Sequence, residues 1–412
     1  MPQIPQDDAL DSSLAFNSEG YEFFRHRHHQ FRSDIFRARL LGKNYYCVFG
    51  ADAARMFYEA DRFTRQGGLP TSTLKLLQDE NSVAVLDGKA HARRKDMFLS
   101  LMAPCNLELI ARLAAEMLLS AAAAQNGKAI KLDEELRSVL CGAACRWADL
   151  RLEPSELQAL THELGAMIDI AGSIGPANWA AQVRRWHSEK LLRQAVDAVR
   201  ADSLRSREGS ALQVIASHRD LDGQLLAPEI CAVELLNILR PIVAISRFMT
   251  FAALALHQHP AVHERLRSDD AFVEPFVQEV RRLAPFFPVV AGVARRNFAW
   301  RDYEFRDGDR FILDLYGTNR DPRTWEDSEA FRPERFIGWS GNPFTMIPHG
   351  GGDFGGHRCA GEWLTIEVMK SVTRTLVRNI DYEVPEQDLT VDLSLVPTSP
   401  KSGLVIDVKS LH

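Results

Sequence analysis

Cys359 is the residue in this sequence best suited to bind a metal. It follows a loop crowded with glycines, residues 348–358, and is predicted to lie on the first turn of a helix whose amphipathic part covers residues 363–377. In that helix four apolar residues recur every four positions and form one stripe: Leu364, Val368, Val372 and Leu376. The positive end of a helix dipole favours a thiolate, which is a ligand that soft metals prefer. A buried structural cysteine is the alternative, and the loop composition and the helix position favour a metal ligand.

A second chemical feature lies in the longest apolar segment of the chain, residues 232–256. A membrane span is possible by length, but Glu234, Asn237, Arg240 and Arg247 make it costly. We therefore expect a helix over residues 228–256, buried in the middle of the protein. Pro241 removes one backbone hydrogen bond and predicts a kink in that helix.

Arg240 is the charged residue of this segment that most needs a partner. A guanidinium stays charged at all ordinary pH values, so its burial requires an anion. That anion is either Glu234 or Glu279 of the protein itself, or the acidic group of a ligand. Arg247 lies on the same face and is a weaker candidate for the same role.

Composition sets the class of protein in which these residues work. The chain has 412 residues, a net charge of −6, 46% hydrophobic residues and six scattered cysteines. These values are typical of a globular protein in a reducing compartment and argue against a nucleic-acid-binding protein. We expect a single domain over residues 1–412, with a polar lead at residues 1–18, no membrane anchor and a cytoplasmic location.

Helices must position both features, because helical periodicity dominates the chain. Helices are predicted near residues 19–32, 50–59, 91–102, 107–126, 133–150, 153–171, 179–205 and 270–283. The histidines of the first, His26, His28 and His29, are expected on its surface. Hairpins are predicted for residues 34–49, for 298–305 with 310–316, and for 389–408, whereas 67–88 and 321–339 should be irregular. The fold class is mainly α with small β-sheets.

Three of these segments together resemble the cytochrome P-450 superfamily of haem-thiolate proteins. They are residues 279–282 (Glu-Val-Arg-Arg), 331–336 (Phe-Arg-Pro-Glu-Arg-Phe) and the glycine loop that ends at 359–361 (Cys-Ala-Gly). The chain is also similar to a bacterial branch of fatty-acid peroxygenases. That likeness lies in residues 86–95, 233–246, 277–282, 313–319, 355–359 and 400–403.

The resemblance implies a single triangular helical domain with haem b, iron protoporphyrin IX, between the long central helix and the cysteine loop. Cys359 would be the axial thiolate ligand, and Glu279, Arg282 and Arg335 a structural ion-pair triad. The haem-contacting residues would be His91, Arg94 and Lys95 at the propionates, with Gly352, His357 and Ala360 in the loop. Most superfamily members have Phe and Arg where this chain has Gly352 and His357, so the loop fits the branch better.

The resemblance also assigns catalytic roles to Arg240 and Pro241. Oxygen-activating members have an acid followed by threonine at this point of the central helix, which this chain lacks. In the branch, the arginine binds the carboxylate of the substrate, and that carboxylate is the general acid and base for hydrogen peroxide. The resemblance therefore implies a fatty-acid hydroxylase acting at the α or β carbon, with no redox partner.

Six residues would line the substrate pocket by the same resemblance: Gln78, Ala84, Ala244, Phe286, Phe287 and Val289. Branch members carry Gln at the position of Ala84 when they hydroxylate and His when they decarboxylate. Alanine cannot donate a proton, which favours hydroxylation, and the polar Gln78 points to a shorter or more polar acid. The alternatives are a decarboxylase that makes terminal alkenes, a reductase-dependent monooxygenase and a non-catalytic haem- or acid-binding module.

Overall fold

The computed structural model describes residues 3–79, 81–125, 127–171 and 176–412. Its α-helices are α1 Ser13–Glu19, α2 Glu22–Phe31, α3 Ala51–Phe57, α4 Thr71–Leu77, α5 Gly88–Ser100, α6 Pro104–Ala124, α7 Leu132–Ala148, α8 Pro154–Asp169, α9 Pro176–Arg200, α10 Ala211–Ser217, α11 Pro228–Gln258, α12 Pro260–Ser268, α13 Val273–Leu283, α14 Leu315–Thr318 and α15 Glu362–Arg378. Short 3-10 helices are η1 Val83–Val85, η2 Asp270–Phe272 and η3 Pro333–Phe336. The chain is therefore mainly α, as its periodicity predicts.

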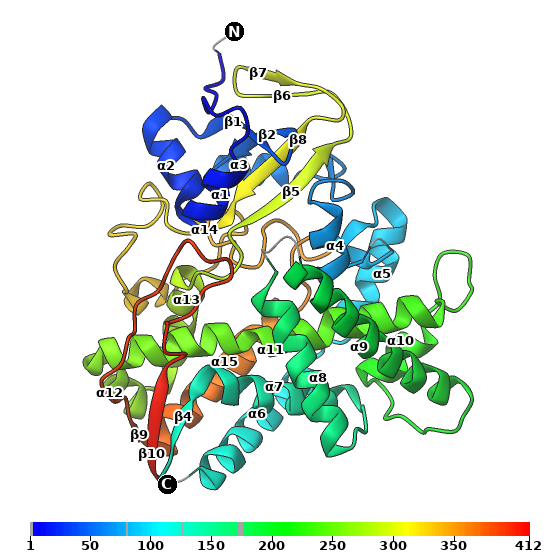
Figure 1. Ribbon diagram of the computed structural model, residues 1–412, viewed down its shortest axis with the longest axis vertical. Helices are drawn as coiled ribbons and strands as arrows, with labels where there is room; N and C mark the ends of the chain where they lie inside the picture. Colours follow the sequence, from blue (N-terminus) through cyan, green and yellow to red (C-terminus); the bar gives the residue numbers. More distant parts are fainter. Residues whose placement is uncertain (1–2, 80, 126, 172–175) are drawn as a thin grey trace.

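The strands are short and form three sheets. They are β1 Ile35–Leu40, β2 Lys43–Val48, β3 Phe63–Thr64, β4 Ala129–Lys131, β5 Val289–Ala294, β6 Phe298–Trp300, β7 Tyr303–Phe305, β8 Arg310–Asp314, β9 Ile380–Glu383 and β10 Val405–Leu411. The largest sheet has the order β1-β2-β8-β5-β3 and lies with α1 to α3 at one end of the molecule, away from the long helices (Figure 1).

α11 is the central helix and crosses the helical part of the molecule (Figure 1). Most of its side chains are buried, and it packs against α7, α9 and α15. It is long and apolar enough to span a membrane, yet 94% of its most apolar window is buried inside the protein, as expected for a core helix. The helix runs unbroken through Pro241 from Pro228 to Gln258.

Strand pairing is where the structure departs most from the sequence prediction. Residues 35–48 form the expected hairpin, with Ile35 opposite Val48. The hairpin predicted between 298–305 and 310–316 is wrong, because β6 and β7 pair with each other while β8 joins the large sheet between β2 and β5. The predicted terminal hairpin over residues 389–408 is also wrong, since β10 pairs with β9 and β4.

Two further local predictions need correction. Residues 67–88 are not irregular throughout, because they contain α4 and η1. His28 is not on the surface: it is 8% exposed, its Nδ1 lies 2.9 Å from the Ser33 carbonyl oxygen, and burial lowers its pKa to about 4. His26 and His29 are exposed as expected.

Candidate active site

The cysteine loop is held in place by close backbone contacts that only glycine permits. Gly350 and Gly352 have positive φ angles of 83° and 77°. A Cβ on Gly351 would lie 2.6 Å from the Pro343 carbonyl oxygen, and one on Gly352 would lie 2.9 Å from the Tyr58 Cβ. Larger residues there would push the loop away from Tyr58, so these glycines fix its path.

The loop delivers Cys359 to the space before α15. Its backbone N–H donates to the His349 carbonyl oxygen at 3.1 Å, and α15 begins at Glu362 after the N-cap Gly361. The cysteine therefore precedes the helix, rather than lying on its first turn as expected. Burial raises the pKa of the thiol, while Lys95 and the Gly361 backbone act in the opposite direction.

A cluster of basic side chains lies beside the cysteine loop. His91 and Lys95, both on α5, are buried, and the rings of His91 and His357 lie 4.2 Å apart between centroids. Lys95 Nζ donates to the Arg358 carbonyl oxygen. Burial and the neighbouring positive charges lower the pKa of His91 to about 4 and that of His357 to about 2. Both imidazoles are therefore neutral at pH 7.

Arg65 is a member of this cluster that the sequence did not reveal. Its guanidinium lies 4.3 Å from the centre of the Phe57 ring and donates to the Ala291 carbonyl oxygen at 3.3 Å, and burial lowers its pKa. Its charge also depresses the pKa of His357. Arg65 stands in an irregular segment with no periodic pattern, so only the folded chain brings it to the site.

These residues fit haem. In the described parts of the chain, no group of three or more His, Cys, Asp and Glu side chains is arranged to hold a metal ion. A metal at Cys359 would therefore take its other ligands from a prosthetic group, as haem iron does from the porphyrin ring. The nearby Lys95 and Arg65 supply positive charge, and the neutral His91 can add a hydrogen-bond donor, suited to the two propionates.

Arg94 has partners other than those the resemblance implied. Its guanidinium donates to Glu234 Oε1 at 2.9 Å and to Asp220 Oδ2 at 2.5 Å. Glu234 is fully buried and also accepts from the Val83 backbone N–H at 2.8 Å and from Asn237 Nδ2 at 3.1 Å. Arg94 thus ties α5 to α11, and its charge is balanced by the protein.

The predicted triad is assembled as a buried network. Both Glu279 oxygens accept from Arg282, at 2.7 and 2.8 Å, and Oε1 also accepts from Arg335 Nε at 3.1 Å. The Arg332 backbone N–H adds a bond of 2.7 Å to the same oxygen. The neighbouring Arg281 donates to Glu362 at 2.5 Å, which joins α13 to the start of α15.

Arg240 is a buried cation with no carboxylate partner among the described residues. It is 8% exposed, and its Nη1 donates to the Leu76 carbonyl oxygen at 3.4 Å. Glu234 and Glu279, the two protein anions considered above, are bonded elsewhere. Burial, and next the charge of Arg185, lower the pKa of Arg240 from 12.5 to about 9. Among the described residues, the positive charge of Arg240 has no ion-pair partner.

Arg247, unlike Arg240, has an ion-pair partner among the described residues and is therefore a structural residue. It forms an ion pair with Asp169 and donates to the Thr398 carbonyl oxygen at 3.2 Å. Its charge is satisfied within the protein, so it no longer competes with Arg240 for an acidic ligand.

The predicted pocket residues come from separate segments. Ala84 lies in η1, which is bonded to Glu234 of α11, and the Gln78 carbonyl oxygen accepts from Asn237 Nδ2 at 3.2 Å. Ala244 is buried one turn after Arg240.

The aromatic members lie on the side of the cysteine loop. The Phe286 ring is 4.4 Å from that of Phe248 on α11 and 6.2 Å from that of His349, between centroids. Phe287 is 47% exposed and packs edge-on against Phe286. Val289 opens β5 opposite Asp314.

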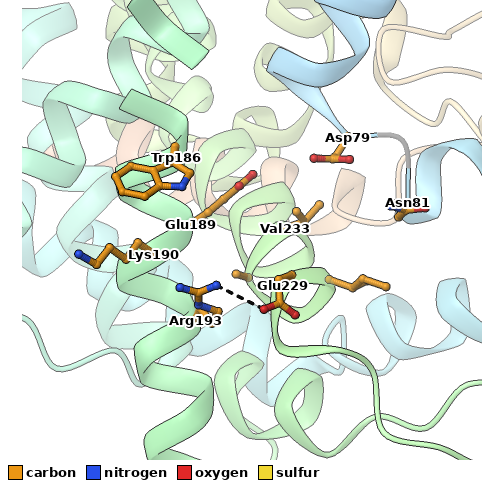
Figure 2. A pocket seen from close by; sticks show the side chains of 10 residues that line it. Asp79, Asn81, Trp186, Glu189, Lys190, Arg193, Glu229 and Val233 are labelled. Carbon is orange, nitrogen blue, oxygen red and sulfur yellow. Dashed lines mark hydrogen bonds and ion pairs between the residues drawn. The ribbon is translucent and has the colours of Figure 1, made fainter. Parts of the chain in front are cut away.

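A surface hollow of about 210 Å³ opens between α9, the end of α4 and the start of α11 (Figure 2). Trp186, Glu189 and Lys190 of α9 lie on one side and Asp79 and Asn81 on the other. None of the predicted pocket residues lines it. It is therefore a feature of the helical surface, separate from the cysteine loop.

Comparisons with known proteins identify the family of this chain. Residues 252–405 match the family described as Cytochrome P450. The chain is 25% identical to cytochrome P450 120 of Synechocystis sp. over 98% of this chain and 95% of that one. It spans about half, 48%, of cytochrome P450 137 of Mycobacterium tuberculosis, at 25% identity over 53% of its own length.

Solved structures are more similar. Cytochrome P450EX alpha (CYP152N1) with myristic acid is 40% identical over 100% of both chains, with a TM-score of 0.95. A variant of cytochrome P450SP alpha (CYP152B1) is 38% identical over 98% of this chain and 100% of that one, at 0.95. A variant of cytochrome P450 OleT in complex with arachidonic acid is 32% identical over 100% and 99%, at 0.97.

The fold and the cysteine loop define a haem-thiolate oxidoreductase. The chain belongs to the cytochrome P450 family, and its similarity to the CYP152 structures extends over its whole length. Its cofactor is haem, bound through a cysteine thiolate.

Proposed function

We propose that the protein is a peroxygenase that uses hydrogen peroxide to hydroxylate a fatty acid at the carbon α or β to its carboxyl group. The observation that carries this proposal is the buried charge of Arg240, which has no ion-pair partner among the described residues. A buried guanidinium needs an anion, and the carboxylate of an acid substrate is an anion of matching geometry. The solved relatives that contain myristic and arachidonic acid support a fatty acid as that substrate.

Arg240 determines both the position and the protonation of the substrate. Its planar fork can donate two parallel hydrogen bonds to the carboxylate and keep it ionised. Haem held by a thiolate supplies peroxide activation and oxygen transfer when it is bound. The acid RCH₂COOH and H₂O₂ then yield RCH(OH)COOH and water, or the corresponding β-hydroxy acid. Anchoring the carboxylate near the reacting centre explains why oxidation falls next to it.

The proton transfer is assigned to the substrate because α11 offers no side chain for it at this point. Pro241, next to Arg240, has neither a backbone N–H nor a titratable group. The bound carboxylate would take the peroxide proton as general base and return it as general acid. The enzyme would then act in the cytoplasm without a reductase or other redox partner.

Ala84 supports hydroxylation rather than decarboxylation. Its methyl group can neither donate nor accept a proton, and the η1 segment that carries it is bonded to α11. The hydroxy acid should therefore be the main product and the terminal alkene a minor one.

The test compares peroxide-driven turnover of the wild-type holoenzyme and Arg240→Gln. Both proteins should show the same haem content and carbon monoxide difference spectrum, because Arg240 is not in the cysteine loop. Without NAD(P)H or ferredoxin, the wild type should form hydroxy acid from myristic acid, and the variant should lose at least about 100-fold in kcat/KM, equivalent to about 3 kcal/mol. Undiminished turnover by the variant would exclude the carboxylate anchor.

A further inference from the structure

A second arginine reaches the same carbonyl oxygen as Arg240. Arg185 of α9 donates from Nη1 to the Leu76 oxygen at 2.8 Å, and Arg240 donates from its own Nη1 to that oxygen at 3.4 Å. Because both nitrogens bond one oxygen, they cannot be more than about 6 Å apart. Arg185 is 3% exposed. Two buried guanidinium groups from different helices therefore converge at the end of α4.

The charges of this pair are not balanced. Neither arginine can lose its proton at ordinary pH, and among the described residues the carboxylate bonded to them is Glu189, whose Oε1 accepts from Arg185 Nε at 2.6 Å. Nη2 of Arg185 is buried and has no hydrogen-bond partner among those residues. A buried donor left unpaired costs about 1–3 kcal/mol. The proximity of Arg185 also contributes to the lowered pKa of Arg240.

One carboxylate can satisfy both groups. Each of its oxygens can accept charge-assisted hydrogen bonds of about 2.7–2.9 Å. The two oxygens can therefore bridge two nitrogens that are up to about 6 Å apart, as those of Arg185 and Arg240 are. Such a ligand would occupy the free Nη2 donor of Arg185 and relieve the repulsion between the two cations. In the ligand-free protein that repulsion is uncompensated, and its relief contributes to binding.

We propose that Arg185 is a second carboxylate-binding residue, which holds the acid group of the substrate jointly with Arg240. This proposal rests on the proposed function, in which the substrate is an acid. Two guanidinium groups from different helices fix the plane of the carboxylate as well as its position. They thereby fix the direction in which the α and β carbons extend from the carboxylate. Arg185 is thus a determinant of specificity for acids over neutral analogues.

The surface hollow gives this two-arginine site an outer boundary. Glu189, the partner of Arg185, lines the hollow together with Trp186 and Val233, and Figure 2 shows it between these two side chains. The side chain of Glu189 thus lies between the hollow and the guanidinium group of Arg185. Glu189 therefore competes with the incoming carboxylate for Arg185, so removal of its charge should tighten acid binding.

The test is a titration of holoenzymes with myristic acid and with its methyl ester, followed by the change in haem absorbance. Arg185→Gln should weaken acid binding about 10- to 100-fold, the loss expected for a hydrogen bond between charged groups. Ester binding should change less than about threefold. Arg184→Gln removes a positive charge from the preceding position of α9 and should leave the affinities for the acid and for the ester unchanged. Arg185→Lys, which keeps the charge but not the fork, should recover part of the loss.

A structural role for Arg185 would give a different pattern. Arg185 also joins α9 to the end of α4, and loss of that link alone would weaken acid and ester binding equally, which would overturn the proposal. Unchanged acid binding by Arg185→Gln would do the same. Should that variant not fold, Glu189→Gln decides the matter: acid binding should tighten by about threefold or more, and weaker or unchanged binding overturns the proposal.

The two proposals fail in different ways. If Arg240→Gln binds and oxidises the acid like the wild type, the proposed function falls and this inference falls with it. If Arg240→Gln loses the acid while Arg185→Gln keeps it, only the role of Arg185 is refuted.

Discussion

Replacement of Arg240 by glutamine should make the ligand-free protein more stable while it removes acid binding. The pKa of Arg240 falls from 12.5 to about 9 in the folded chain. At about 1.4 kcal/mol for each pH unit, the buried charge destabilises the fold by at most about 5 kcal/mol. Gln removes this charge and retains an amide that can donate to the Leu76 oxygen. After the loss of packing, we expect a net gain of about 1–3 kcal/mol.

The same substitution removes the partner of the substrate carboxylate. Truncation of one side of a buried, hydrogen-bonded charge pair costs about 2–5 kcal/mol, which is about 30- to several-thousand-fold in affinity. Thermal unfolding of the ligand-free holoenzyme should therefore show a Tm higher by about 2–4 °C, and a titration should show little binding of myristic acid.

Arg247→Gln is the matched control for this experiment. It makes the same change on the same face of α11, at a residue whose charge is paired with Asp169. Loss of that pair should lower the Tm and leave acid affinity close to that of the wild type. If Arg240→Gln is destabilised as much as Arg247→Gln, or still binds the acid tightly, the charge of Arg240 is compensated and the reasoning is wrong.

Three further predictions follow from charges inside the fold. Acid affinity should be constant between about pH 6 and pH 8 and fall about tenfold per pH unit above about 9. The reason is that only protonated Arg240 attracts the carboxylate. A dissociation constant for the acid that does not change up to about pH 10 would contradict this prediction. Glu279→Gln should destabilise the protein by about 3–5 kcal/mol and lower haem retention, since it leaves the buried Arg282 without its anion. A variant with the same Tm as the wild type would show that the ion-pair network around Glu279 does not stabilise the fold. Asp314→Asn should raise the Tm more at pH 8 than at pH 5. Burial raises the pKa of Asp314 from 3.8 to about 7, so the wild type loses stability as pH rises through that range. An equal change in Tm at both pH values would refute this prediction.

The helices and the cysteine loop could be predicted because their signals are local. The apolar stripe that ends at Leu376, the glycines before Cys359 and the long apolar run around Arg240 are each contained in one segment. The structure has α15 and α11 within a few residues of the predicted bounds. Even the need of Arg240 for an anion followed from its charge and its apolar neighbours alone.

The remaining features depend on contacts between distant segments. The strand 310–314 carries a short apolar run that fits several partners, and only the folded chain selects β2 and β5 over the nearer β6–β7 pair. The resemblance placed Arg94 at the haem propionates, whereas Glu234, its partner in the structure, lies 140 positions away in the sequence. Arg65 and Arg185 gave no signal at all, because each is functional only through what it faces.

The central claim is that the carboxylate of the substrate, held by Arg240, does the acid–base work of the reaction. The most direct measurement compares peroxide-driven oxidation of myristic acid and of 1-tetradecanol, which has the same chain without the acid group, by the same wild-type holoenzyme. The account predicts hydroxylated product from the acid and at least about 100-fold less oxidation of the alcohol, even when the alcohol is bound to saturation. Equal turnover of acid and alcohol would show that another group moves the peroxide proton, and would contradict the account.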